Sequence, residues 1–351
     1  MSDVKFRTDS SAGSLAATNC LFEANTNVAD KTGGILRFEA SNYETAVANG
    51  ASLFVSNCTF KANYSKSSNG TAYGLVRSNA TGTGIEVGNS LLKGLLVCED
   101  CVFEDNWSEG KPGAVSSTRG RPIVACRFVR NRAKKGAGGA MDLRQYSEIR
   151  DCVFEGNVSD DANGGAISST KRSSVTETSN GGYGSVIEGC SFLTNSAPNC
   201  GGAIYAEEVA FDNVWDAPIS IVGCAFTNNT TTLVGKSQAG SYYSKGGAVY
   251  GGTVSNCTFV GNSAVSYAGA YCNMSPGGNV DDCTFVSNSV IKWNYEPLYG
   301  GAVHLLQAAR VSHCRFMGNT ISSVSSSSCG GAALSADAGG TVRDCVFVGN
   351  C

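Results

Sequence analysis

Residues 152–157 read CVFEGN and residues 164–167 read GGAI, and these two blocks alternate along the chain. A unit that returns about every 25 to 43 residues predicts a solenoid, in which each coil is stabilised by its neighbours rather than by one globular core. The first block is a copy of Cys-x-Phe-x-x-Asn, which occurs eleven times, beginning at Cys20, Cys58, Cys101, Cys126, Cys152, Cys190, Cys224, Cys257, Cys283, Cys314 and Cys345.

A phenylalanine lies two residues after each of these cysteines. Residues i and i+2 of a strand point to the same face, so coils stacked in register would carry a ladder of thiols beside a ladder of rings. Cys257 and Cys283 would be neighbours in the thiol ladder. Burying each ring is expected to stabilise the fold by about 1.5 to 3 kcal/mol. The ring ladder includes Phe154, Phe192, Phe259 and Phe285.

An asparagine follows three residues after each of these phenylalanines, as at Asn157 and Asn262. Asparagine tolerates left-handed backbone, and its side chain bonds the local main chain. We therefore predict that this residue marks a corner of each coil.

The glycine block has ten copies, with an apolar residue such as Ile167 or Ile204 two positions after its second glycine. A position that excludes even alanine requires positive φ or leaves no room for a Cβ atom against a neighbouring coil. Both explanations remain open from sequence, and the apolar residue is predicted to point inward. The second position is glycine at Gly34, Gly74, Gly113, Gly139, Gly165, Gly202, Gly247, Gly269, Gly301 and Gly331.

The shortest repeats indicate a parallel β-helix. They span about 25 residues, which is enough for three short strands and three corners but shows no helical periodicity. About eleven coils at roughly 4.8 Å each would form a rod. Residues 1–351 are therefore expected to form a single parallel β-helix domain of an all-β protein, with loop insertions, as part of a longer chain or assembly.

The alternation of Gly-Gly-Ala-Ile with Phe-x-x-Asn resembles the repeats of the chlamydial polymorphic outer membrane proteins. The resemblance covers nearly the whole chain and implies a right-handed parallel β-helix exposed at a surface, commonly with an adhesive role. It thus implies an extracellular or cell-surface location. The cysteine before each phenylalanine is a stronger feature here than that family's pattern requires.

Charge and hydropathy exclude several classes of partner. The formal net charge is −3, and no Lys/Arg cluster runs along a predicted face, so no nucleic-acid partner is expected. No apolar run is long enough for a membrane-spanning helix, so no membrane span is expected in these residues. Nothing in the sequence calls for a cofactor.

The chain contains 16 cysteines, eleven of them at the repeat position. A small inward-facing hydrophobe explains such a ladder as well as disulfides do, and we favour buried free thiols. The pair Cys98-x-x-Cys101 would suit a zinc or redox site, but no second ligand pair has the required spacing. We therefore interpret this pair as structural.

A polysaccharide-active enzyme is the third hypothesis, because β-helices of that class group carboxylates and basic residues on one face. Asp282, His313 and Asp344 precede the ladder cysteine on three consecutive repeats and are candidate ligands for a metal or a proton carrier. The same position elsewhere holds plain turn residues, which favours an exposed corner. His304 is predicted to point outward, and no catalytic residues are assigned. The plain turn residues are Asn19, Asn57, Asp100, Asp151 and Asn256.

Aromatic residues in three successive insertions form the candidate binding site. Exposed Tyr and Trp on adjacent coils suit a glycan or protein partner, although they could also fold down over the rod. The leading hypothesis is a non-enzymatic structural and adhesive β-helix, and the alternative is a fibre module that stacks on neighbouring copies of itself. The candidate residues are Tyr242, Tyr243, Tyr267, Trp293, Tyr295 and Tyr299.

Overall fold

A computed structural model describes most of the chain, and its regular structure consists of β-strands. None of the described residues forms a helix long and apolar enough to cross a membrane. The described ranges are 4–8, 14–28, 36–40, 52–66, 76–80, 96–110, 112–116, 120–143, 147–169, 185–206, 210–211, 214–215, 219–232, 244–275, 278–291, 298–306, 309–322, 330–337 and 339–351.

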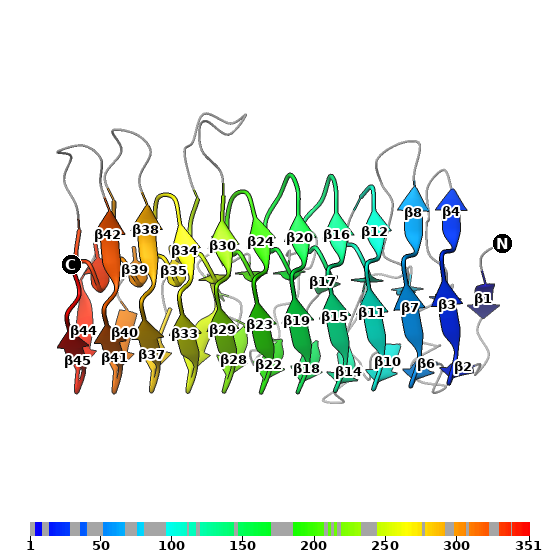
Figure 1. Ribbon diagram of the computed structural model, residues 1–351. Helices are drawn as coiled ribbons and strands as arrows, with labels where there is room; N and C mark the ends of the chain where they lie inside the picture. Colours follow the sequence, from blue (N-terminus) through cyan, green and yellow to red (C-terminus); the bar gives the residue numbers. More distant parts are fainter. Residues whose placement is uncertain are drawn as a thin grey trace.

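The strands form four parallel sheets that run the length of a rod, with the two termini at opposite ends (Figure 1). Sheets A, B and C have 11 strands each and sheet D has 10. Each strand pairs with the equivalent strands of the coils before and after it, so the protein is a parallel β-helix, as predicted. A coil has four strands where the sequence predicted three. The additional strand, in sheet D, follows the motif asparagine.

Sheets A and B carry the half of the repeat that follows the glycine block. Sheet A contains β1 (Val4–Thr8), β5 (Leu36–Ala40), β9 (Val76–Ala80), β13 (Val115–Ser116), β17 (Met141–Leu143), β21 (Ile167–Ser169), β25 (Ile204–Ala206), β31 (Val249–Tyr250), β35 (Tyr271–Asn273), β39 (Val303–Leu305) and β43 (Leu334–Ala336). Sheet B contains β2 (Ser14–Thr18), β6 (Ser52–Ser56), β10 (Leu96–Glu99), β14 (Gly120–Val124), β18 (Glu148–Arg150), β22 (Val186–Glu188), β28 (Ser220–Val222), β32 (Thr253–Ser255), β36 (Val280–Asp281), β40 (Ala309–Ser312) and β44 (Gly340–Arg343).

Sheets C and D carry the half of the repeat that follows the cysteine. Sheet C contains β3 (Leu21–Glu23), β7 (Thr59–Lys61), β11 (Val102–Glu104), β15 (Arg127–Val129), β19 (Val153–Glu155), β23 (Ser191–Leu193), β29 (Ala225–Thr227), β33 (Thr258–Val260), β37 (Thr284–Val286), β41 (Arg315–Met317) and β45 (Val346–Val348). Sheet D contains β4 (Thr26–Val28), β8 (Tyr64–Lys66), β12 (Trp107–Ser108), β16 (Arg132–Ala133), β20 (Val158–Ser159), β24 (Ser196–Ala197), β30 (Thr230–Thr231), β34 (Ser263–Ala264), β38 (Ser289–Ile291) and β42 (Thr320–Ser322). A short antiparallel hairpin, β26 (Ala210–Phe211) and β27 (Val214–Trp215), lies in one connection from sheet A to sheet B.

The rings of sheet C stack face to face through the centre of the rod. Phe154 and Phe192 are register partners whose ring centroids are 4.8 Å apart with planes 4° from parallel. The spacing is that of neighbouring strands, because in-register parallel pairing places identical side chains directly above one another. Phe259 and Phe285 repeat the arrangement at 4.8 Å. All four rings are fully buried.

The motif asparagine is a buried link between coils rather than a left-handed corner residue. The amide Nδ2 of Asn157 donates to the carbonyl oxygen of Phe128 at 2.9 Å and to Oδ1 of Asn195 at 2.9 Å. The residue before it, Gly156, is the one with positive φ, at 61°. The predicted backbone of the asparagine is therefore wrong, because a left-handed residue at the corner turns the next side chain into the interior. There an amide must find partners in other coils.

The second glycine of each block is required by close packing and not by its backbone angle. A Cβ atom on Gly202 would lie 2.0 Å from the carbonyl oxygen of Gly247 in the next coil. It is the first glycine, Gly201, whose φ is positive, at 64°. The last block departs from the prediction, because Val303 pairs with Leu334, which moves Gly331 to the first position and Ala332 to the second. No described coil stacks beyond Ala332.

The thiols of the described ladder are free and mostly buried. Cys190 shows the pattern: its Sγ is 3.3 Å from the carbonyl oxygen of Glu188, and its backbone N–H donates to Sγ of Cys224 at 3.4 Å. Each thiol therefore occupies a small apolar position and also satisfies the backbone of the preceding coil.

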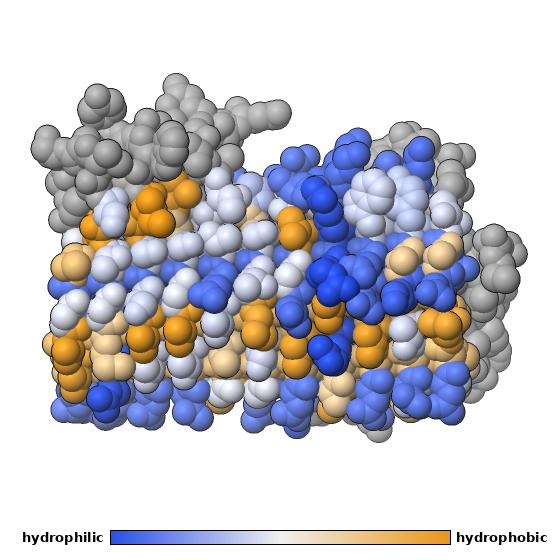
Figure 2. Space-filling view, in the orientation of Figure 1, coloured by the Kyte–Doolittle hydropathy of each residue, from blue (hydrophilic) through white to orange (hydrophobic). Residues whose placement is uncertain are grey.

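The outer surface varies from coil to coil. Figure 2 shows a deep blue band over β15 and β16, where arginines form ion pairs with carboxylates of the coils on both sides. Arg130 lies 2.6 Å from Glu104 and 2.7 Å from Asp105, and Arg132 lies 2.9 Å from Asp160. These pairs are exposed and contribute little stability, about 0 to 1 kcal/mol each.

Candidate functional site

The residue before each ladder cysteine forms an exposed column at the corner between sheets B and C, which we call the corner ladder. Its backbone is left-handed throughout, with φ between 48° and 63°. Asn and Asp tolerate this conformation and glycine adopts it freely. The position therefore constrains the backbone conformation but not the chemistry of the exposed side chain. The corner ladder consists of Asn19, Asn57, Asp100, Ala125, Asp151, Gly189, Gly223, Asn256, Asp282, His313 and Asp344.

The structure brings His313 between carboxylates. Its Nε2 lies 3.7 Å from Asp344, and its Nδ1 lies 3.0 Å from Asp281, a residue that the sequence analysis did not select. Asp282 lies close enough to His313 and Asp281 for the three to share one ion. These side chains are largely exposed, with 42% of the His313 side chain accessible. Asp281 was missed because it ends strand β36, one position before the column that the sequence aligned.

Hydrogen bonds hold the Asp281 carboxylate in place. Ser312 Oγ donates to its Oδ1 at 2.6 Å, and this bond lowers the pKa of Asp281, with a further contribution from His313. Bonds to a charged carboxylate favour its ionised form. The arrangement can carry a proton or attract a cation at the surface. The sequence offered no nucleophile to complete a catalytic set.

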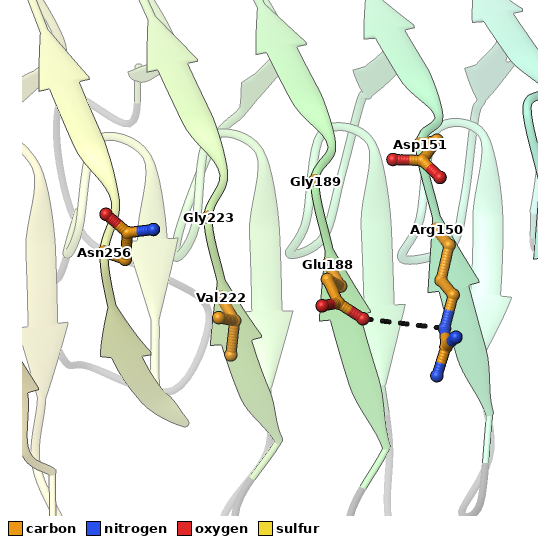
Figure 3. A pocket seen from close by; sticks show the side chains of 7 residues that line it. All are labelled: Arg150, Asp151, Glu188, Gly189, Val222, Gly223 and Asn256. Carbon is orange, nitrogen blue, oxygen red and sulfur yellow. Dashed lines mark ion pairs between the residues drawn. The ribbon is translucent and has the colours of Figure 1, made fainter.

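A depression of about 420 Å³ lies at the middle of the corner ladder (Figure 3). It exists because Gly189 and Gly223 leave two consecutive gaps in the column of side chains. Asp151 and Asn256 border the gap on the column itself, and Arg150, which is 3.6 Å from Glu188, borders it from sheet B. The depression therefore offers a guanidinium, two carboxylates and a carboxamide around exposed backbone.

Two of the six predicted aromatic residues can be placed. Tyr267 and Tyr299 stack on adjacent coils with centroids 5.4 Å apart, and both are partly exposed. They lie over the outer face of sheet A, where each contacts the His304 ring at 5.3 and 5.2 Å. The structure thus joins them to the rod as a small cluster. The other four, Tyr242, Tyr243, Trp293 and Tyr295, lie outside the described residues.

His304 points away from the coil interior, yet it is fully buried. The predicted outward direction is therefore confirmed, and the ring is buried because Tyr267 and Tyr299 cover it. Burial lowers the pKa of His304 to about 4, while the Asp337 carboxylate, 3.9 Å from Nε2, opposes this shift. Its register neighbour Cys272 is also fully buried, and burial raises the pKa of that thiol. Both shifts favour the neutral forms, so burial opposes a thiolate–imidazolium pair.

A second aromatic pair was not selected from the sequence. Tyr64 and Trp107 stack on sheet D with centroids 4.4 Å apart, and Lys134 Nζ lies 5.4 Å from the Trp107 ring. The Tyr64 hydroxyl donates to Glu109 at 2.7 Å, and desolvation together with this bond raises its pKa to about 12. The signal was available, because each residue directly follows a motif asparagine and must therefore lie on adjacent coils.

The in-register sheets and the three interior ladders define a parallel β-helix repeat protein. Two segments, residues 151–170 and 189–207, match the family model of the Chlamydia polymorphic membrane protein repeat. Each segment carries the cysteine motif and the glycine block of one coil, which confirms the predicted resemblance. None of the curated proteins or solved structures compared with the chain matches it.

Proposed function

We propose that this protein is a non-enzymatic structural and adhesive β-helix, extracellular or at a cell surface, that binds a glycan or a protein partner through its corners and loop insertions. The main supporting observation is that the interior and the corner positions of the repeat behave differently. Interior positions recur in coil after coil, whereas the corner ladder changes residue type while its backbone stays constant. A scaffold of this kind can vary its surface without altering its fold. The match to a membrane protein repeat supports a surface location.

The corner depression supports a polar, uncharged ligand such as a saccharide. Its volume of about 420 Å³ suits one or two sugar rings, and its lining includes both donors, on Arg150 and Asn256, and acceptors, on Asp151 and Glu188. The Arg150–Glu188 ion pair is exposed, so a ligand hydroxyl can join it without burying an unpaired charge. Aromatic side chains of the insertions would add stacking contacts at a neighbouring corner.

A glycan array and a panel of immobilised cell-surface proteins test the proposal. Two variants separate the sites: Arg150→Ala with Asn256→Ala at the depression, and Tyr243→Ala with Trp293→Ala in the insertions. Loss of binding in either pair, with an unchanged melting temperature, supports that site. Thr258→Val, an exposed change on β33, is the matched control. No binding to any ligand class would contradict the adhesive role.

The enzymatic alternative has its own test at Asp282, His313 and Asp344. A screen for polysaccharide depolymerisation should detect no new reducing ends with the native chain. Product that disappears in His313→Asn would replace the adhesive proposal with a catalytic one. Asparagine tolerates the left-handed backbone of this corner, so the variant should still fold. A loss of product would then reflect the missing imidazole rather than a misfolded chain.

End-to-end stacking of copies is the second candidate, because each coil presents apolar side chains and strand edges that another coil can cover. Val346, Phe347 and Val348 are 47%, 47% and 55% exposed on strand β45. A further coil, from the same chain or from another copy, would cover them and pair the open strand edge. Light scattering should show assembly that depends on concentration and is abolished by Val348→Lys. Scattering that does not change with concentration would contradict this candidate.

A further inference from the structure

Cys98 interrupts an otherwise aliphatic column of sheet B. Its register partners are Val55 in the coil before and Ile123 in the coil after, and the column continues as Ile149 and Ile187. All of these side chains point inward and are buried, Cys98 completely. One coil therefore has a thiol at the position where the neighbouring coils have a branched aliphatic side chain.

The corner brings this thiol to the thiol ladder. Asp100, with φ of 52°, turns the chain so that Cys98 at the end of β10 and Cys101 before β11 both face the interior. Cys126 is the ladder cysteine of the next coil. Its Sγ lies 3.8 Å from Sγ of Cys98, and all three sulfurs lie within 4.8 Å of one another. The sequence showed the Cys98-x-x-Cys101 pair but not its third member, which comes from the neighbouring coil.

The spacing of the sulfurs suits one soft cation. Three sulfurs held in a plane at about 2.3 Å from a common cation lie about 4 Å from each other. The three sulfurs lie within 4.8 Å of one another, so each pair would have to approach by less than about 1 Å to reach this arrangement. Thiolate ligands select d10 ions such as Zn(II), Cd(II) and Cu(I), whereas hard cations require oxygen ligands. The surrounding buried side chains, including Val55, Phe103 and Phe128, offer none. The oxygens beside the sulfurs are backbone carbonyls, such as that of Glu99 at 3.1 Å from Sγ of Cys101, and they carry no charge to bind a hard cation.

We propose that Cys98, Cys101 and Cys126 form an interior three-sulfur site for a thiophilic d10 cation. The thiols that bind as thiolates release their protons to solvent as the cation enters. Full burial of the three cysteines means that the cation enters while the coils are closing and is retained afterwards. The site would link two successive coils of the rod and is independent of what the outer surface binds.

A metal-content experiment with matched variants tests this site. The chain is unfolded and refolded under reducing, anaerobic conditions with Zn(II), with Cd(II) or with a Cu(I) complex, then desalted and measured by elemental mass spectrometry. We expect one cation per chain, together with an ultraviolet thiolate-to-cadmium charge-transfer band in the Cd(II) sample. Comparison of the three ions shows which one the site retains.

Cys98→Val restores the aliphatic column and should remove the cation and the band while the chain still folds. Ile187→Cys is the reciprocal variant, because position 187 stands to Cys190 and Cys224 as Cys98 stands to Cys101 and Cys126. It should raise the content to two cations per chain. Equal metal content in the native chain and Cys98→Val would overturn the proposal.

Two further outcomes also count against the proposal. A native chain that folds with all thiols titratable and retains no cation would show that Cys98 acts only as a small hydrophobe. A disulfide from Cys98 to Cys101 or Cys126, found by peptide mapping of chain purified without reductant and persisting during refolding with metal, would show that the cluster is an oxidised crosslink.

Discussion

The interior asparagine ladder and the corner ladder repeat with the same coils, but they tolerate very different residues. Asn195 is fully buried, and its amide bonds to the coils on both sides. At the corner, Asp151, Gly189 and His313 occupy equivalent positions with nearly the same φ. The interior constrains the atoms of the side chain, whereas the corner constrains only the backbone. Recurrence of one residue in every coil is therefore a measure of contact between coils.

The largest expected effect is at the glycine where two coils touch. In Gly202→Val the new Cβ atom would lie 2.0 Å from the oxygen of Gly247 and 2.6 Å from the backbone of Thr230. We expect a loss of roughly 4 kcal/mol or more, or failure to fold. Thr258→Val should change stability by less than about 0.5 kcal/mol. Chemical denaturation followed by circular dichroism compares the two, and equal midpoints would contradict the close contact.

Removing an interior amide should cost somewhat less. Asn195→Ala leaves the Phe154 carbonyl and the Asn157 donors without their partner in the interior. Each unsatisfied buried group costs about 1 to 3 kcal/mol. Because Nδ2 of Asn157 keeps its bond to the Phe128 carbonyl, we expect a total near the lower end, about 3 kcal/mol. Ser196→Ala, on the outer side of sheet D, is the control and should be close to neutral. The comparison between ladders fails if the two variants unfold at the same denaturant concentration.

The His304 side chain points outward from the coil but is buried. It therefore tests whether the loss of stability depends on burial or on the side to which a residue points. Its pKa of about 4 lies below the ordinary value of 6.5, so the unfolded chain binds more protons between these values. Stability should be complete above about pH 6.5 and fall by about 2 to 3 kcal/mol as the pH drops towards 4. The free energy of unfolding, measured by denaturation at several pH values in this range, should depend less on pH in His304→Gln. An unchanged pH dependence would show that the ring is hydrated.

The smallest effect is expected at the corner. His313→Asn keeps a residue that tolerates left-handed backbone and removes only exposed contacts with the Asp281 and Asp344 carboxylates. We expect a change below about 0.5 kcal/mol in either direction. Thermal melts of this variant beside the native chain measure it. A loss of stability as large as that of Asn195→Ala would mean that the side chains of the corner ladder also contribute to packing between coils.

The ladders were predictable because the same residue recurs at a fixed spacing. Phe259 and Phe285 needed only the two-residue period of a strand to be placed on one inner face. The asparagine was harder, since Asn157 and its neighbour Gly156 are both turn formers and sequence spacing does not show which one carries positive φ. Ala332 was hidden by a shift of one residue in the last block.

The candidate site was less predictable because it depends on positions without side chains and on residues that are distant in the sequence. Gly189 and Gly223 create the depression by lacking side chains, and a gap has no motif. Asp281 reaches His313 only through the register of two strands. Cys126 joins Cys98 for the same reason, although the repeat phase places both in adjacent coils. Strand register, rather than local sequence pattern, therefore determines which side chains meet, both at the corner and in the cysteine cluster.

The amide column gives the rod a direction. Every described link runs the same way: Asn157 donates to Asn195, which donates to Asn229, and the chain of bonds ends at Asn350. Aligned amide dipoles strengthen one another, and every amide in the column directs its donor towards Asn350 and its acceptor towards Asn25. A body that extends the rod in head-to-tail orientation prolongs this polarity, whereas a head-to-head contact opposes like partial charges. The amide column therefore distinguishes the two directions along the rod axis.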